Sequence, residues 1–103
     1  MKLSVVIATH ARPDSLARLV ASLAPQLSPG RELIVADNGT PEPSTLPDSA
    51  ALTAHVHDSR PGKCRVQNAA IARASGEILV FLDDDLVVAP DYLEQVERFF
   101  AEH

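Results

Sequence analysis

The sequence predicts an α/β fold: a mostly parallel, open sheet with helices on both faces. Residues 3–8, 32–36 and 78–83 form runs of apolar residues with little polar alternation. Such runs are typical of strands that are covered on both faces. Segments with helical periodicity separate these runs along the chain. Strands that alternate with helices favour parallel pairing through crossover connections.

The first predicted helix follows the strand at residues 3–8. Pro13 suits its first turn, where the missing N–H of proline costs nothing. One apolar stripe at helical spacing follows, made of Leu16, Leu19, Val20, Leu23 and Leu27. Pro25 is expected to end or kink this helix, because proline removes an interior hydrogen bond.

The rest of the chain continues the alternation. Residues 41–49 hold Pro41, Pro43 and Pro47 and are expected to form a surface loop. Residues 52–57 alternate in polarity, which predicts a short, half-exposed strand. A helix is expected over residues 63–75, with Gly76 placed to end it. Pro90 is expected to open a last helix with an apolar face of Tyr92, Leu93, Val96, Phe99 and Phe100.

The composition limits the classes of function. At 103 residues with 46% apolar and 22% charged residues, the chain is expected to form a single globular domain, residues 1–103. A formal charge of −5 argues against a nucleic-acid-binding surface. One cysteine, Cys64, cannot form an internal disulfide, which favours a reducing, cytoplasmic compartment. No apolar stretch has the length of a membrane span.

Several standard sites are excluded by spacing. The four glycines do not fall at the dinucleotide-binding spacing, and Gly62-Lys63 lacks the earlier glycine of a phosphate-binding P-loop. The histidines show no zinc-ligand spacing and are expected on the surface or in loops.

Three adjacent carboxylates, Asp83-Asp84-Asp85, close the last apolar strand. Ligands of open α/β sheets bind beyond the carboxyl ends of the strands. Extended residues alternate in direction, so Asp83 and Asp85 should share one side and Asp84 the other. Hard oxygen ligands at this density suit Mg²⁺ or Mn²⁺. The alternative is a solvated turn, in which an acid caps the local backbone.

Other polar residues follow the remaining strands. Thr9-His10 and Asp37-Asn38 should reach the same edge of a parallel sheet as the acids. Asp37 could contact the base or ribose of a nucleotide, or could serve only the turn that follows it. The cations Arg60, Lys63 and Arg65 near the start of a helix could hold a diphosphate, or could form a solvated basic surface.

Taken together, these motifs resemble the nucleotide-sugar-binding, N-terminal half of the family 2 glycosyltransferases, a Rossmann-like part of the GT-A fold. Four stretches in the same order carry the resemblance, and they are residues 4–9 with Arg12, residues 33–40, Gly62 with residues 68–72, and residues 76–85 with residues 90–93.

The resemblance implies a nucleotide-diphospho-sugar donor, linked to UDP or GDP, and a divalent cation, Mn²⁺ or Mg²⁺. By this resemblance Asp37 contacts the base, and Asp85 with Asp83 holds the metal. Asp83 or Asp84 lies nearer the ribose. Thr9 and Asn68 match further positions of the nucleotide-sugar site.

Two departures from the family pattern limit these expectations. Gln67 stands where the family usually carries an arginine that holds the nucleotide. Family members also continue beyond the last helix, and the later half supplies the acceptor site and the catalytic base. The catalytic base and the acceptor site are therefore not expected within this chain. By itself the chain is expected to be inactive and to self-associate. The alternatives are a non-catalytic metal- and nucleotide-binding module or scaffold, or another Mg²⁺-dependent α/β enzyme such as a phosphatase.

Overall fold

A computed structural model describes residues 2–43, 46, 54–60 and 62–102. The elements in chain order are strand β1 (Leu3–Thr9), helix α1 (Pro13–Leu23), a short 3-10 helix (Ala24–Gln26), β2 (Arg31–Asn38), β3 (Ala54–Asp58), α2 (Lys63–Arg73), β4 (Ile78–Asp83) and α3 (Tyr92–Glu102). The loop expected at residues 41–49 and the strand start expected at residue 52 lie partly outside the described residues.

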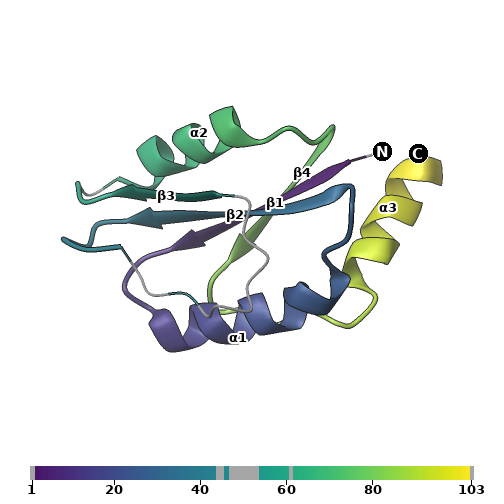
Figure 1. Ribbon diagram of the computed structural model, residues 1–103, viewed down its shortest axis with the longest axis horizontal. Helices are drawn as coiled ribbons and strands as arrows, with labels where there is room; N and C mark the ends of the chain where they lie inside the picture. Colours follow the sequence, from purple (N-terminus) through teal and green to yellow (C-terminus); the bar gives the residue numbers. More distant parts are fainter. Residues whose placement is uncertain (1, 44–45, 47–53, 61, 103) are drawn as a thin grey trace.

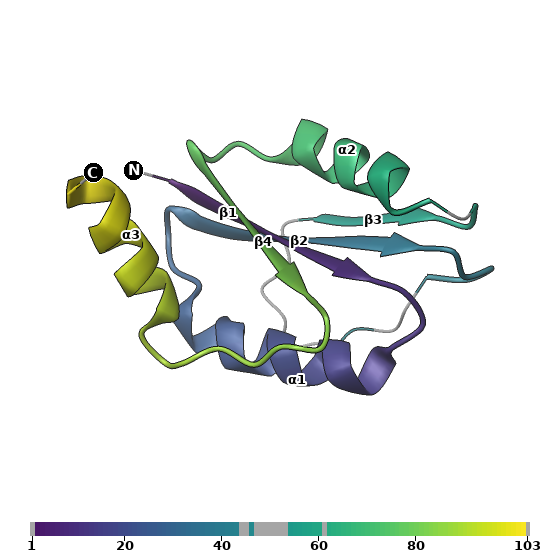
Figure 2. The same cartoon turned by 180° about the vertical axis from the view of Figure 1, so that it is seen from behind.

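The described strands form one parallel sheet in the order β3-β2-β1-β4. Helix α2 covers one face of this sheet, and α1 lies against the other (Figure 1). The view from behind shows the same layers, with α3 beside the end of α1 (Figure 2). The predicted α/β architecture, with a parallel sheet and helices on both faces, is confirmed.

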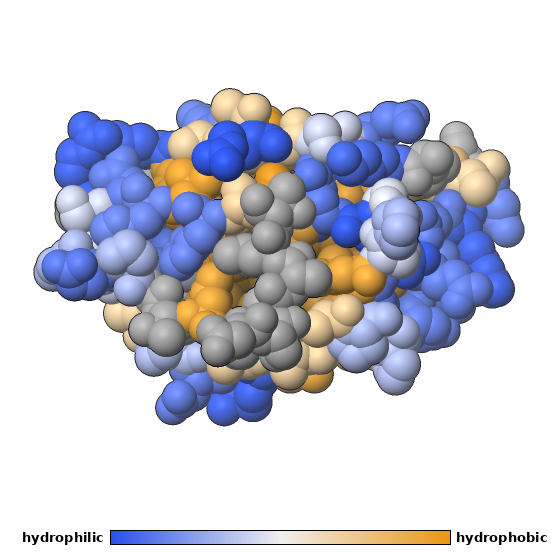
Figure 3. Space-filling view, in the orientation of Figure 1, coloured by the Kyte–Doolittle hydropathy of each residue, from blue (hydrophilic) through white to orange (hydrophobic). Residues whose placement is uncertain are grey.

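The larger core lies between the sheet and α1. The stripe residues within α1 are buried there, whereas Leu27 lies beyond the end of the helix and is half-buried against the same core. Leu93 of α3 joins this core. Helix α1 starts at Pro13 and ends just before Ala24-Pro25, as the two prolines predict. Apolar surface gathers near the middle of the molecule, between more hydrophilic ends (Figure 3).

The smaller core lies under α2 and comprises Val6, Ile34, Ala36, Ala54, Val66 and Ala70. These residues come from β1, β2, β3 and α2, and none comes from β4. Helix α2 ends at Arg73, two residues before the expected end, and α3 starts at Tyr92 rather than at Pro90.

Strand β4 corrects the expectation of a strand buried on both faces. It is an edge strand of the described sheet, and its side chains alternate between buried and exposed. Leu79 and Phe81 pair in register with Ser4 and Val6 on the α2 face, yet they are 37% and 48% exposed. The physical reason is that α2 packs over β1, β2 and β3 and leaves this part of β4 uncovered. Among the helical residues, Phe99 and Phe100 are also exposed, as expected.

A buried carboxylate ties the sheet together at the amino ends of the strands. Glu32 of β2 accepts hydrogen bonds from Ser4 Oγ (2.5 Å) and from the Ser75 amide (2.7 Å) and hydroxyl (3.1 Å). The Lys2 ammonium lies 3.8 Å from the Glu32 carboxylate. Burial raises the pKa of Glu32, but the hydrogen bonds from Ser4 and Ser75 and the charge of Lys2 outweigh it, so the pKa lies below its ordinary value.

In the described part of the chain, no helix is both long enough and apolar enough to cross a bilayer.

Candidate functional site

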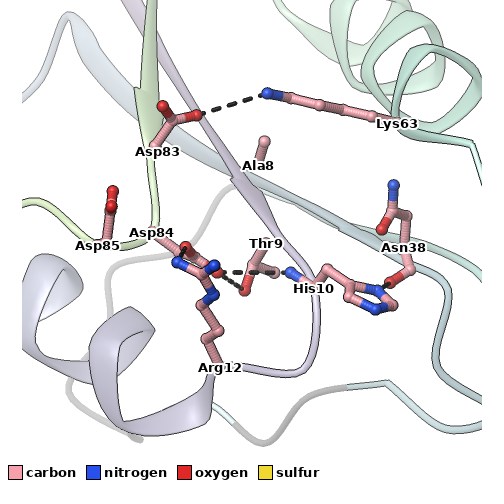
Figure 4. A pocket seen from close by; sticks show the side chains of 9 residues that line it. All are labelled: Ala8, Thr9, His10, Arg12, Asn38, Lys63, Asp83, Asp84 and Asp85. Atoms are coloured by element: carbon pink, nitrogen blue, oxygen red, sulfur yellow. Dashed lines mark hydrogen bonds and ion pairs between the residues drawn. The ribbon is translucent and has the colours of Figure 1, made fainter.

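A cleft of about 310 Å³ opens at the carboxyl ends of β1, β2 and β4. The strand order reverses between β1 and β4, and ligands of open α/β sheets bind at such switch points. The cleft is lined by Ala8, Thr9, His10, Arg12, Asn38, Lys63, Asp83, Asp84 and Asp85 (Figure 4). The sequence-predicted edge therefore coincides with the cavity.

The three acids lie where β4 ends and a turn begins. Asp83 is the last residue of the strand, and its carbonyl accepts a 3.4 Å hydrogen bond from the Leu86 amide. Asp83 and Asp85 are exposed to the cleft, whereas Asp84 is only 6% exposed. This division agrees with the predicted alternation of side-chain direction.

Asp84 contacts the segment between β1 and α1 (Figure 4). Its Oδ2 accepts hydrogen bonds from Thr9 Oγ1 at 2.8 Å and from the His10 amide at 3.4 Å. Its Oδ1 lies 3.6 Å from Arg12 Nη1. Both carboxylate oxygens are therefore engaged within the protein.

Lys63 is the cation that lines the cleft opposite the acids. It is the first residue of α2, and its Nζ lies 3.5 Å from Asp83 Oδ1. Both side chains are more than half exposed, so this ion pair adds little stability and can be exchanged for a ligand.

The other two cations considered from the sequence do not line the cleft. Arg60 donates to both oxygens of Asp58, and these hydrogen bonds lower the pKa of Asp58 to about 2. Arg65 is exposed on α2 and is not among the cleft residues.

Asp37 does not line the cleft. Its side chain is fully buried, and His55 Nε2 donates to its Oδ2 at 3.0 Å. The next residue, Asn38, lines the cleft instead. Asn68 is exposed on α2 and also lies outside the cleft. Of the predicted site residues, the structure thus brings together Thr9, Asp83, Asp84 and Asp85.

His10 lines the cleft, at the edge where Thr9-His10 is expected, although the sequence assigns it no role in the site. Its Nδ1 donates to the Asn38 carbonyl at 2.6 Å, which fixes the ring against the end of β2. A Cβ at Gly39 would lie 2.5 Å from this ring, so glycine is required beside it. The usable signal was its position directly after a predicted strand, next to Thr9.

The carboxylate oxygens at this edge suit a hard divalent cation that is also coordinated by oxygens of a bound substrate. Among the described residues, no group of three His, Cys, Asp or Glu side chains is arranged to hold a metal alone. Asp83 and Asp85 nevertheless present two exposed carboxylates to one cleft. Mg²⁺ is commonly held by one or two carboxylates together with substrate phosphates and water.

Known proteins resemble this chain along nearly all of its length. A model of the family described as Glycosyl transferase family 2 matches residues 4–103. The uncharacterised glycosyltransferase YwdF of Bacillus subtilis (strain 168) is 29% identical over 95% of this chain and 38% of its own length. The O-antigen biosynthesis protein RfbC of Myxococcus xanthus is 34% identical over 92% of this chain and 8% of its own length.

Solved structures of S. aureus TarS share the fold. One TarS chain superposes with a TM-score of 0.78 at 24% identity, covering 100% of this chain and 20% of that one. TarS 1–349 in complex with UDP-GlcNAc gives a TM-score of 0.75 at 25% identity, covering 100% of this chain and 32% of that one. This chain spans between 8% and 38% of the length of the curated relatives that it matches. The family match over residues 4–103, the order of the motifs and the shared fold together place the chain in glycosyltransferase family 2.

Proposed function

We propose that the cleft binds a nucleotide-diphospho-sugar with a divalent cation, and that the chain is the donor-binding part of a glycosyltransferase. The observation that carries this proposal is the placement of two exposed carboxylates, Asp83 and Asp85, opposite Lys63 at the sheet's switch point. Solved TarS chains of the same fold are in complex with UDP-GlcNAc and with UDP, which supports UDP as the nucleotide.

Each charged cleft residue has a role in this proposal. Asp83 and Asp85 hold Mn²⁺ or Mg²⁺, with Asp83 also within reach of the ribose. Lys63 leaves Asp83 and pairs with the diphosphate, so the cleft exchanges one weak ion pair for contacts with the ligand. A divalent cation held by Asp83 and Asp85 would supply positive charge that stabilises a leaving diphosphate.

The assignment of Asp37 to the base and of Asn68 to the nucleotide stays a prediction. Contact between the base and Asp37 requires the Asp37–His55 pair to open, because Asp37 is fully buried. Asn38 and His10 already face the cleft at the end of β2. The acceptor, the sugar and the catalytic base are not assigned to residues of this chain.

Calorimetry tests donor binding directly. UDP should bind the chain in Mn²⁺ and should bind at least about tenfold more weakly in excess chelator, because without a cation the carboxylates of Asp83 and Asp85 would repel the diphosphate. Asp85→Asn should lose the Mn²⁺ dependence without changing the melting temperature, because Asp85 is exposed. Asp14→Asn, at an exposed aspartate outside the cleft, is the matched control. A UDP affinity that changes neither in excess chelator nor in Asp85→Asn would refute the proposal.

A further inference from the structure

The middle acid of the cluster differs from its two neighbours. The Asp83 side chain is 69% exposed, and Asp85 is also exposed, whereas the Asp84 side chain is 8% exposed. Figure 4 shows Asp84 directed toward Thr9 and Arg12, while Asp83 lies toward Lys63. Burial and direction therefore separate Asp84 from the two acids that face the open cleft.

The partners of Asp84 all belong to the segment that joins β1 to α1. They are the Thr9 hydroxyl, the His10 amide and the Arg12 guanidinium. Within this segment Ala11 has φ 52°, a left-handed conformation that a residue with a Cβ adopts at a cost. Three contacts to one carboxylate offset that cost and hold the segment in place.

We infer that Asp84 is a positioning residue of the proposed donor site, which ties residues 9–12 to the acid turn and is not a metal or sugar ligand. Turning Asp84 toward a metal would leave the Thr9 hydroxyl, which is nearly fully buried, without its acceptor. The same tether fixes the backbone from which Asp83 and Asp85 face the cleft. The tether also holds His10 and Arg12 in their positions at the side of the cleft. The expected effect of Asp84 on nucleotide binding rests on the proposed function. The tether between Asp84 and residues 9–12 does not depend on that function.

A double-mutant cycle separates positioning from direct contact. Titration of UDP in Mn²⁺ is measured for Thr9→Val, Asp84→Ala and the double variant. Each single change should weaken binding by about tenfold, the value of one hydrogen bond to a charged group. The double variant should be little weaker than Asp84→Ala alone, because that change already removes the Thr9 contact along with those to the His10 amide and Arg12. Effects that multiply would overturn the inference, since Asp84 would then act on the ligand independently of Thr9.

A conservative replacement gives a second readout in the same assay. Asp84→Asn keeps an oxygen that can accept from Thr9 and His10, so UDP binding should stay within about threefold of the unmodified chain. Asp85→Asn should lose Mn²⁺-dependent binding. If Asp84→Asn is as damaging as Asp84→Ala while the ligand-free exchange described next stays protected, the charge of Asp84 faces the ligand and the inference is wrong.

Amide hydrogen exchange of the ligand-free chain tests the tether independently of any nucleotide. The His10 amide should exchange about tenfold faster in Asp84→Ala, and Asp85→Ala should leave it unchanged. Unchanged exchange in Asp84→Ala overturns the tether whatever the binding data show. A chain that binds neither Mn²⁺ nor UDP overturns the proposed function, and the exchange experiment still decides the structural role of Asp84.

Discussion

Replacing Glu32 by glutamine should destabilise the chain, and the loss should depend on pH. The change keeps the size and shape of the side chain but removes the charge that accepts hydrogen bonds from Ser4 and Ser75. A hydrogen bond to a charged group contributes about 1.5–3 kcal/mol and a neutral one about 0.5–1.5 kcal/mol. With two strong bonds converted and part of the burial cost relieved, we expect a loss of about 2 kcal/mol at pH 7.

The pH dependence follows from the direction of the pKa shift. The folded state lowers the pKa of Glu32 below its ordinary 4.5, so the folded chain binds this proton less readily than the unfolded chain. Its contribution is therefore complete above the unfolded pKa and is lost as the pH falls through the folded pKa. Glutamine does not titrate, so the gap between the two proteins should be largest at neutral pH and should shrink below about pH 4.5.

Urea denaturation at pH 7 and at several lower pH values measures this gap. Glu77→Gln is the matched control, because Glu77 is an exposed glutamate directly before β4, near the end of the sheet where Glu32 lies. The control should show no gap at any pH. The difference in free energy of unfolding between Glu32→Gln and the unmodified chain should be smaller at about pH 3.5 than at pH 7. An equal difference at both pH values would refute the reasoning. So would a Glu32→Gln variant as stable as the unmodified chain.

Two further predictions concern the neighbourhood of β4. Gly76→Ala should lower the melting temperature strongly, because its Cβ would lie 2.5 Å from Ser4 Oγ and 2.7 Å from the Ser4 backbone nitrogen; thermal unfolding with unchanged Tm would contradict this. Phe81→Ser should reduce self-association in light scattering without loss of stability, because Phe81 is 48% exposed on the uncovered part of the edge strand. A variant that associates as strongly as the unmodified chain would locate the contact elsewhere.

The local sequence pattern was enough to predict the helices and strands. It did not predict which strands pair or which helix covers them. Pro13 and Pro25 gave correct limits for α1, because proline acts on the helix within a few residues, whereas the apolar stripe continued to Leu27, beyond the helix. The exposure of Leu79 and Phe81 could not be predicted, because an apolar run looks the same in a central strand and at an edge. That difference is set by which strand pairs with which, and by how far α2 extends across the sheet.

The site was predicted where direction follows from strand alternation. The burial of Asp84 between exposed Asp83 and Asp85 agreed with that alternation. At the end of β2 the prediction chose Asp37, whereas the structure places Asn38 in the cleft. Asp37 is instead buried against His55 of β3, a contact between residues 18 positions apart that no local pattern of the sequence predicts.

The late arrival of β4 has a consequence for how the chain is made. Thr9 and Asp84 are 75 positions apart, yet their side chains meet in one hydrogen bond. β1 is synthesised before β4, and in the described sheet one edge of β1 has no partner until β4 is inserted beside it. A nascent chain that ends before Asp85 cannot assemble the cleft. A ligand that binds there would therefore bind only molecules in which β4 has paired with β1, and its binding energy would stabilise that pairing.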